Sequence, residues 1–189
     1  IKEMQPLLEA CRFLENNRAR FPGFGEVLYR WLRPIFHDIS QTEEKLYLAA
    51  CHLHDTIWQA HPDYRSEVCF ETVTGANLGG IDHKGRVFLA LALMSRYKRT
   101  NFNSVNKEIL NLLDETSIRN AMILGTSMRL GSMLSVTISS NLIKTKIFLE
   151  EKDICLSLNE KDNFLGEVVE KRLTHLAQLM GLNPKIIVD

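Results

Sequence analysis

The spacing of apolar residues changes once along this chain, and that change constrains the fold more than any other feature. Through residues 6–138, apolar side chains recur every three or four positions, as on one face of a helix. Over residues 142–149 and 153–158 they alternate with polar residues, which is typical of strands. We therefore expect a mainly α fold, in which a helical bundle is followed by a small α+β unit.

Local signals predict where several helices begin and end. Ser40 and Glu43 have the spacing of a capping box, and Asp82 is expected to cap a strongly apolar helix. Pro34 lies inside an apolar stripe and should kink that helix or end it early. Further helix starts are expected at Pro6, Ser66, Ser104, Thr116 and Asn163.

The last quarter of the chain has a different pattern. A charged segment at 150–153 separates the two alternating runs, so a β-hairpin is predicted there. An amphipathic helix then ends at Gly181, and residues 185–188 suit a third strand. We expect a helical domain over residues 1–140 and a hairpin and helix subdomain over residues 141–189, packed on it.

The composition excludes several classes of protein. The chain has 23 Lys and Arg against 23 Asp and Glu, so no global basic field would hold nucleic acid or anionic lipid. A local basic groove is still compatible with this balance. The longest strongly apolar run, residues 87–94, is too short to span a bilayer. We expect a soluble protein without nucleic-acid or membrane partners.

The cysteines and the first residue carry weaker information. No CxxC spacing occurs, so a zinc site made of thiolates is not expected. The cysteines are expected to be small buried side chains in a reducing, cytoplasmic compartment. Because the chain begins at Ile1 without a leader pattern, we expect a fragment of a longer protein.

The first chemical candidate is the pair His54 and Asp55, which closes a helix. Adjacent imidazole and carboxylate groups can bind one divalent cation when a helix end turns both side chains inward. Two ligands do not hold a catalytic metal, so others would have to come from other helices. The alternative interpretation is structural, with Asp55 accepting hydrogen bonds at the helix end and His54 filling a cleft.

The second candidate is a group of cations between Tyr64 and Thr100. A polyphosphate chain needs Arg and Lys at intervals along its path, and Arg gives bidentate contacts. The alternative is that these are ordinary solvated charges at helix ends. The candidate substrate-binding residues are Arg65, Lys84, Arg86, Arg96, Lys98 and Arg99.

Five segments occur in a recognisable order: PLLEACRFL, RFPGFGEVLYRWLRPIF, AACHLHD, HPDYRSEVCFETV and DHKGRVFLALALMSRYKR. A long helix, a hairpin and a final helix follow them. In this order the chain resembles the C-terminal half of the exopolyphosphatase / guanosine pentaphosphate phosphohydrolase family, and in particular the alphaproteobacterial type of exopolyphosphatase. The resemblance covers nearly all of the chain.

The resemblance implies a division of labour. Members of the family have N-terminal actin-like domains with the phosphate-binding loops, the catalytic Glu and Mg²⁺, and nothing like them occurs here. Their C-terminal half is a helical module similar to HD-type metal phosphohydrolases, thought to extend the polyphosphate channel and to support dimerisation. The resemblance therefore implies no catalytic residue and no cofactor in this chain. Its implied partners are inorganic polyphosphate, the protein's own N-terminal domains and a second copy.

The chain departs from the HD metal pattern. His54 and Asp55 match its central pair, but at least half of the other ligands are missing, so we expect a degenerate relic that binds no metal. The upstream position falls near Phe24 or Glu26, the next near His61 or Arg65, and the last near Gly131, Ser132 or Ser135.

Three functions remain open at this point. The chain is expected to be a non-catalytic substrate-channel and dimerisation domain of an exopolyphosphatase. The alternative is an HD-type metal-dependent phosphohydrolase active by itself, and the third is a purely structural or regulatory interaction domain. The resemblance leaves open whether the parent prefers polyphosphate or guanosine pentaphosphate, pppGpp.

Overall fold

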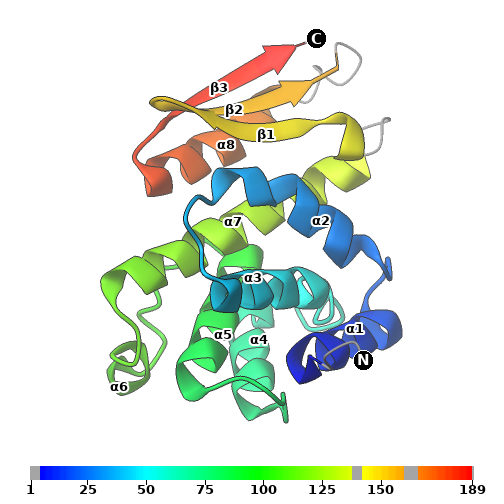
Figure 1. Ribbon diagram of the computed structural model, residues 1–189, viewed down its shortest axis with the longest axis vertical. Coiled ribbons are helices and arrows are strands. Elements are labelled where there is room, and N and C mark those ends of the chain that lie inside the picture. Colours follow the sequence, from blue (N-terminus) through cyan, green and yellow to red (C-terminus); the bar gives the residue numbers. More distant parts are fainter. Residues whose placement is uncertain (1–4, 138–141, 160–165, 189) are drawn as a thin grey trace.

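The computed structural model describes residues 5–137, 142–159 and 166–188, and these are mainly α-helical, as the apolar spacing predicts. A small sheet and helix α8 complete the chain, so the expected fold class is confirmed (Figure 1). The helices are α1 (Pro6–Arg18), α2 (Phe24–Leu32), α3 (Gln41–Leu53), α4 (Arg65–Gly75), α5 (His83–Tyr97), α6 (Lys107–Leu110), α7 (Glu115–Thr137) and α8 (Gly166–Met180). The strands are β1 (Lys146–Glu150), β2 (Asp153–Leu158) and β3 (Asn183–Val188).

Helix α5 is the centre of the helical part, since every residue from Val87 to Ser95 is buried. It packs closely against α7, where Gly125 faces the end of α5. A Cβ at Gly125 would lie 2.3 Å from the carbonyl oxygen of Ala92 and 2.5 Å from the Cβ of Ser95. The missing side chain therefore permits this close approach, and the approach brings the C-terminal end of α5 against the middle of α7.

Three of the predicted helix signals are confirmed. Ser40 and Glu43 form the full capping box of α3. Asp82 caps α5 by accepting a hydrogen bond from the backbone N–H of Gly85 at 2.7 Å. The stripe that contains Pro34 stops being α-helical at Leu32 and continues as a 3-10 turn over Arg33–Ile35, because proline cannot donate the next helical hydrogen bond.

Two predicted helix starts are wrong. Helix α4 begins at Arg65, with Tyr64 at the cap, and Ser66 is buried inside the first turn. Helix α6 does not start at Ser104, because Asn106 is its cap and accepts from the backbone N–H of Glu108 at 2.7 Å. Helix α7 begins at Glu115, one residue before the expected start. The expected cap Asn163 lies outside the described residues.

The sheet has the strand order β1-β2-β3. Strands β1 and β2 form the predicted antiparallel hairpin, and β3 pairs in parallel with β2. A parallel neighbour requires a crossover connection, and α8 provides it. One correction concerns the hairpin start, since residues 142–144 form a 3-10 turn and β1 begins at Lys146. Helix α8 ends at Met180, and the next residue, Gly181, has a φ of 69°.

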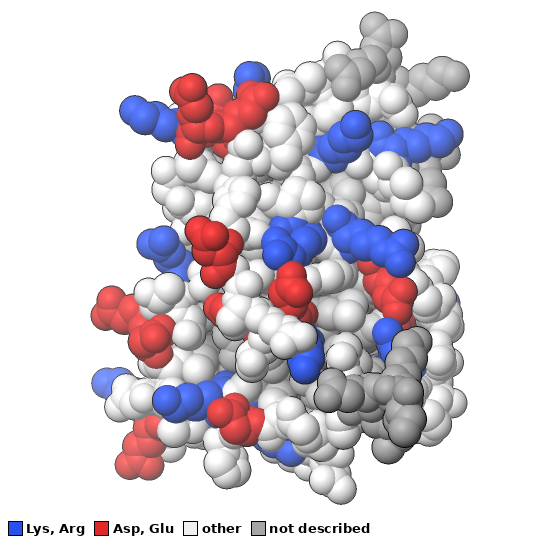
Figure 2. All heavy atoms as spheres, in the orientation of Figure 1, with Lys and Arg blue, Asp and Glu red and all other residues white. Residues whose placement is uncertain are grey.

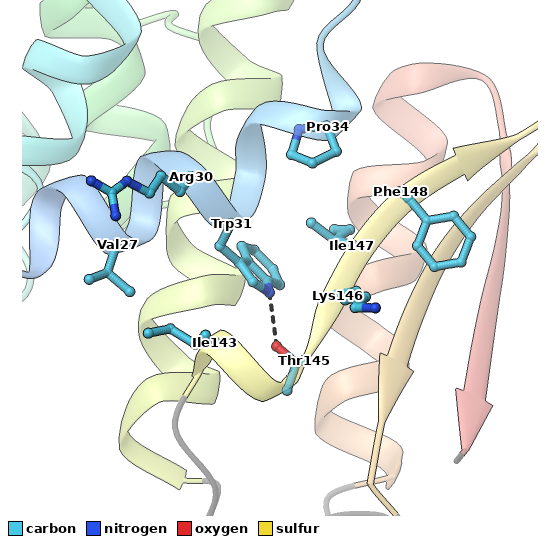
Figure 3. A pocket seen from close by; sticks show the side chains of 9 residues that line it. All are labelled: Val27, Arg30, Trp31, Pro34, Ile143, Thr145, Lys146, Ile147 and Phe148. Carbon is cyan, nitrogen blue, oxygen red and sulfur yellow. Dashed lines mark hydrogen bonds between the residues drawn. The ribbon is translucent and has the colours of Figure 1, made fainter.

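Helix α8 lies between the sheet and α7, so its two faces are covered by different partners (Figure 1). A second connection joins α2 to the sheet. Trp31 Nε1 donates to Thr145 Oγ1 at 2.8 Å, and both side chains are buried (Figure 3). Beside this bond lies an apolar cleft of about 440 Å³ that includes Val27, Pro34 and Ile147. Among the described ranges, no helix combines the length and the hydropathy that a bilayer crossing requires.

Candidate anion-binding cavity

A cavity of about 290 Å³ lies where the end of α3 meets α4, α5, α7 and α8. This cavity, here called the arginine cavity, is unusual in its charge, because its lining contains five arginines and a single carboxylate. The lining residues are Arg20, Phe21, Phe24, His54, Asp55, Arg65, Arg96, Tyr97, Arg129, Ser132, Met133, Ser135, Val136 and Arg172. Such a ratio of charges suits an anion.

The single carboxylate, Asp55, is already paired. It is 3% exposed, and it accepts hydrogen bonds from the backbone N–H of Arg20 at 3.1 Å and from Arg20 Nε at 3.0 Å. Arg20 Nη2 donates to its second oxygen. Burial raises the pKa of the Asp55 carboxyl, but the hydrogen bonds and charge of Arg20 outweigh burial and hold that pKa below its usual value. Asp55 is therefore an ionised anchor for the segment that joins α1 to α2.

His54 forms part of the cavity wall in its neutral form. Its Nδ1 donates to the carbonyl oxygen of Cys51 at 2.7 Å, which leaves Nε2 without a proton. Burial, and after it the positive charge of Arg96, lower the pKa of His54 to about 4. At neutral pH this residue contributes neither a positive charge nor a negative one. Phe24 packs against its ring at a centroid distance of 5.6 Å.

The residues do not fit a divalent metal ion. A metal would need the oxygens of Asp55, but Arg20 occupies both of them. The other charged groups of the lining are all arginines, which repel a metal ion. Among the described residues, no three His, Cys, Asp or Glu side chains lie close enough together to hold a metal ion.

The positions at which the resemblance implies the other metal ligands lie around this same cavity. Phe24, Arg65, Ser132 and Ser135 all line it together with the His54 and Asp55 pair. His61 does not, because it is exposed and lies 3.7 Å from Asp63. At these positions the chain thus has an aromatic ring and a guanidinium, which cannot coordinate a divalent cation, and two neutral hydroxyl groups in place of a carboxylate.

Tyr97 separates two of the cationic groups. The guanidinium of Arg65 lies 5.5 Å from the centre of its ring, and that of Arg96 lies 5.0 Å from it. The hydroxyl of Tyr97 donates to the carbonyl oxygen of His54 at 2.8 Å. Arg65 is also held by the carbonyl oxygens of Trp58 and Ala60. This arrangement fixes the first residue of α4 against the end of α5.

Burial and neighbouring positive charges both lower the pKa of the cations deeper in the cavity. Burial, and after it the nearby Arg172 and Arg96, lower the pKa of Arg129. Burial lowers the pKa of Arg96 as well, and Arg20 and Arg65 add to that effect. An arginine remains charged in spite of such shifts. The cavity therefore holds positive charge that the described residues leave largely uncompensated.

Residues 7–187 match the protein family described as "Exopolyphosphatase, C-terminal". The chain belongs to this family. The membership confirms the resemblance drawn from the five segments, and it implies a hydrolase as the parent protein. No curated protein matches the chain.

The candidate cations of this exopolyphosphatase C-terminal domain do not all lie together. Arg65 and Arg96 line the arginine cavity, whereas Lys98 and Arg99 line a neighbouring groove of about 710 Å³ that also contains Glu67. Lys84 lies in a separate hollow with Asp82 and Asp114. Arg86 donates to the carbonyl oxygens of Ala76 and Leu78, so its guanidinium holds the loop between α4 and α5.

Sequence reasoning missed Arg20, Arg129 and Arg172, which line the cavity as well. These residues come from distant parts of the chain, so no local cluster marks them. One signal was available for Arg129. It is the only charged residue in the segment 120–137, and a lone charge in an apolar helix indicates a special environment.

Proposed function

We propose that this chain is a non-catalytic substrate-binding domain of an exopolyphosphatase and that the arginine cavity binds inorganic polyphosphate. The observation that supports the proposal is the charge of the cavity, five arginines with one carboxylate that Arg20 already neutralises. Arginine is the residue best suited to phosphate oxygens, because its planar fork donates two parallel hydrogen bonds.

In this proposal the chemistry takes place elsewhere in the parent protein. The parent removes the terminal phosphate of polyphosphate with Mg²⁺, which the actin-like N-terminal domains would hold, and this domain supplies a charged surface for the chain. Guanosine pentaphosphate has a terminal phosphate of the same kind and is the second ligand to be tested. The family resemblance supports a homodimer and a cytoplasmic location as further parts of the proposal.

An HD-type phosphohydrolase active by itself is the alternative. It would require Asp55 to exchange its hydrogen bonds with Arg20 for a metal ion, and it would require further ligands from a lining rich in arginine. A metal bound at this place would also meet the charge of Arg65 and Arg96. The contacts of Asp55 therefore favour the non-catalytic domain.

Titration of the purified chain with polyphosphate tests the proposal. We expect binding that weakens as salt rises, because charge attraction between arginines and phosphates is screened. Arg96→Ala should weaken binding by about 10- to 100-fold, the usual loss for a charge-assisted hydrogen bond. Arg119→Ala is the matched control, since Arg119 is exposed on α7 and lies outside the cavity.

The same samples should be assayed for bound metal and for phosphate release with Mg²⁺. The proposal predicts neither a stoichiometric metal nor turnover. Binding that is insensitive to salt and survives Arg96→Ala would contradict the cavity as the site. Turnover with bound metal in a clean preparation would instead favour the phosphohydrolase.

A further inference from the structure

The five cavity arginines fall into two groups that differ in their partners. Arg20 and Arg65 are occupied, since the first pairs with Asp55 and the second donates to two carbonyl oxygens. Arg96, Arg129 and Arg172 form no ion pair with any residue in the described ranges. These three, here called the arginine triad, are the groups that remain for a ligand.

The hydrogen-bonding capacity of the triad is mostly unused. Nε of Arg96 is buried and has no partner among the described residues, and its Nη2 makes a long bond of 3.3 Å to Ser132 Oγ. Arg129 has no hydrogen bond among the described residues. Within the described ranges, Arg172 donates to the sulfur of Met133 at 3.0 Å and to no other atom, and sulfur is a weak acceptor. A buried guanidinium N–H without an acceptor is costly, so the Nε of Arg96, together with the two half-buried guanidinium groups beside it, calls for an anion.

The triad is held by three different helices. Arg96 is on α5, Arg129 on α7 and Arg172 on α8. The close approach at Gly125 fixes α5 against α7, and α8 packs on the other side of α7. The three guanidinium groups therefore approach one space from different directions, which suits an anion with several oxygens around one centre.

We infer that the arginine triad is a site for one terminal phosphoryl group, either the end of a polyphosphate chain or free orthophosphate, and not for the interior of a chain. The inference rests on the proposed function and specifies the ligand of the same cavity. A terminal phosphoryl group carries about −1.5 to −2 charges at pH 7 and presents three acceptor oxygens. An interior phosphate has about one charge and two free oxygens, so three guanidinium groups match the terminal group better.

The rim of the cavity agrees with this assignment. Phe21 and Val136 line it and are 60% and 71% exposed, so the rim includes two apolar side chains. A chain that ran through the cavity would need cations on both sides of the triad to follow its charges. A chain that enters by its terminal phosphate needs cations only inside the cavity, at the triad.

The test uses three forms of polyphosphate: chains of increasing length, chains with both ends capped by an alkyl amine, and orthophosphate alone. Binding at ends predicts that affinity per mole of chain stays within about 2-fold as length increases, because each chain has two ends. It also predicts that capped chains lose at least 10-fold in affinity and that orthophosphate competes. Arg129→Met and Arg172→Met should each weaken the binding of both polyphosphate and orthophosphate by about 10- to 100-fold, and Arg119→Met should not.

The outcomes separate the two proposals. If capped and uncapped chains bind equally, and if affinity per chain rises in proportion to length, the terminal site is wrong while polyphosphate binding stands. If orthophosphate binds through the triad but no chain does, the terminal site stands and the proposed function is wrong. If neither ligand binds the wild-type chain, both are overturned.

Discussion

The pair of Arg20 and Asp55 explains why the candidate metal dipeptide has a structural role. Asp55 is buried at the end of α3, and it receives both the guanidinium and the backbone N–H of Arg20. A carboxylate that anchors a chain segment in this way cannot also bind a metal. The neighbouring His54 is neutral, so the charge that remains in the cavity comes from arginine.

The neutral state of His54 makes a prediction about stability and pH. The folded chain keeps this imidazole unprotonated down to a pKa of about 4, because burial and Arg96 disfavour its charged form. In the unfolded chain the imidazole takes up a proton below about pH 6.5. The unfolded state therefore binds more protons between these values, and the free energy of unfolding should fall as pH falls, by up to about 1.4 kcal/mol per pH unit.

Denaturant unfolding of the wild type and of His54→Gln between pH 7 and pH 4.5 measures this effect. The variant should show a shallower slope, because Gln does not titrate. Asp55 does not interfere in this range, since its folded pKa is lowered and its contribution is lost only below about pH 4. An identical slope in both proteins would assign the effect to another group.

At the scale of secondary structure, the contact between α5 and α7 determines where the arginine triad lies. Replacing glycine by alanine in a helix normally stabilises it by up to about 1 kcal/mol. At Gly125 the added Cβ would lie 2.3 Å from the carbonyl oxygen of Ala92, so the two helices would have to separate. Gly125→Ala should therefore destabilise the fold by about 1–3 kcal/mol.

Gly75→Ala is the matched control for this prediction. An added Cβ there meets nothing within 4 Å, so the change should be neutral or slightly stabilising. Thermal unfolding of the two variants beside the wild type makes the comparison. Equal midpoints for Gly125→Ala and Gly75→Ala would mean that the close approach of α5 and α7 is not needed.

The elements show which parts of the fold could be predicted from the sequence. The capping box at Ser40, the cap at Asp82 and the hairpin follow from neighbouring residues, and they were predicted. The start of α6 was missed because Asn106 competes with Ser104 for the cap, and local preference alone does not decide such a competition. Family resemblance supplied the functional class, and no spacing in the chain did.

The cavity was predictable only in part, for a physical reason. His54 and Asp55 were recognised as a pair, and Arg65 and Arg96 as cations, because each lies in a conspicuous local run. Arg129 and Arg172 join them only through the packing of α7 and α8. No sequence pattern reports that long-range contact, and for that reason the triad was not foreseen.

The net charge of the whole molecule gives no indication of this cavity. The formal net charge is +0, and on the face shown in Figure 2 the basic and acidic side chains are interspersed. A local excess of positive charge occurs at the cavity, whose lining has five arginines and one carboxylate. A ligand for this domain is therefore expected to be recognised by a compact group of arginines and not by a broad basic surface.

Thermal unfolding of the wild type, Arg129→Met and Arg119→Met, each with and without tripolyphosphate, tests most directly whether the cavity is built for a phosphate ligand. Arg129 is half-buried beside Arg96 and Arg172, and these like charges repel in the free protein, so Arg129→Met should raise the melting temperature without ligand and remove the ligand-induced rise. Arg119→Met should leave both unchanged. A lower melting temperature for Arg129→Met without ligand, together with an undiminished rise on adding tripolyphosphate, would contradict the assignment.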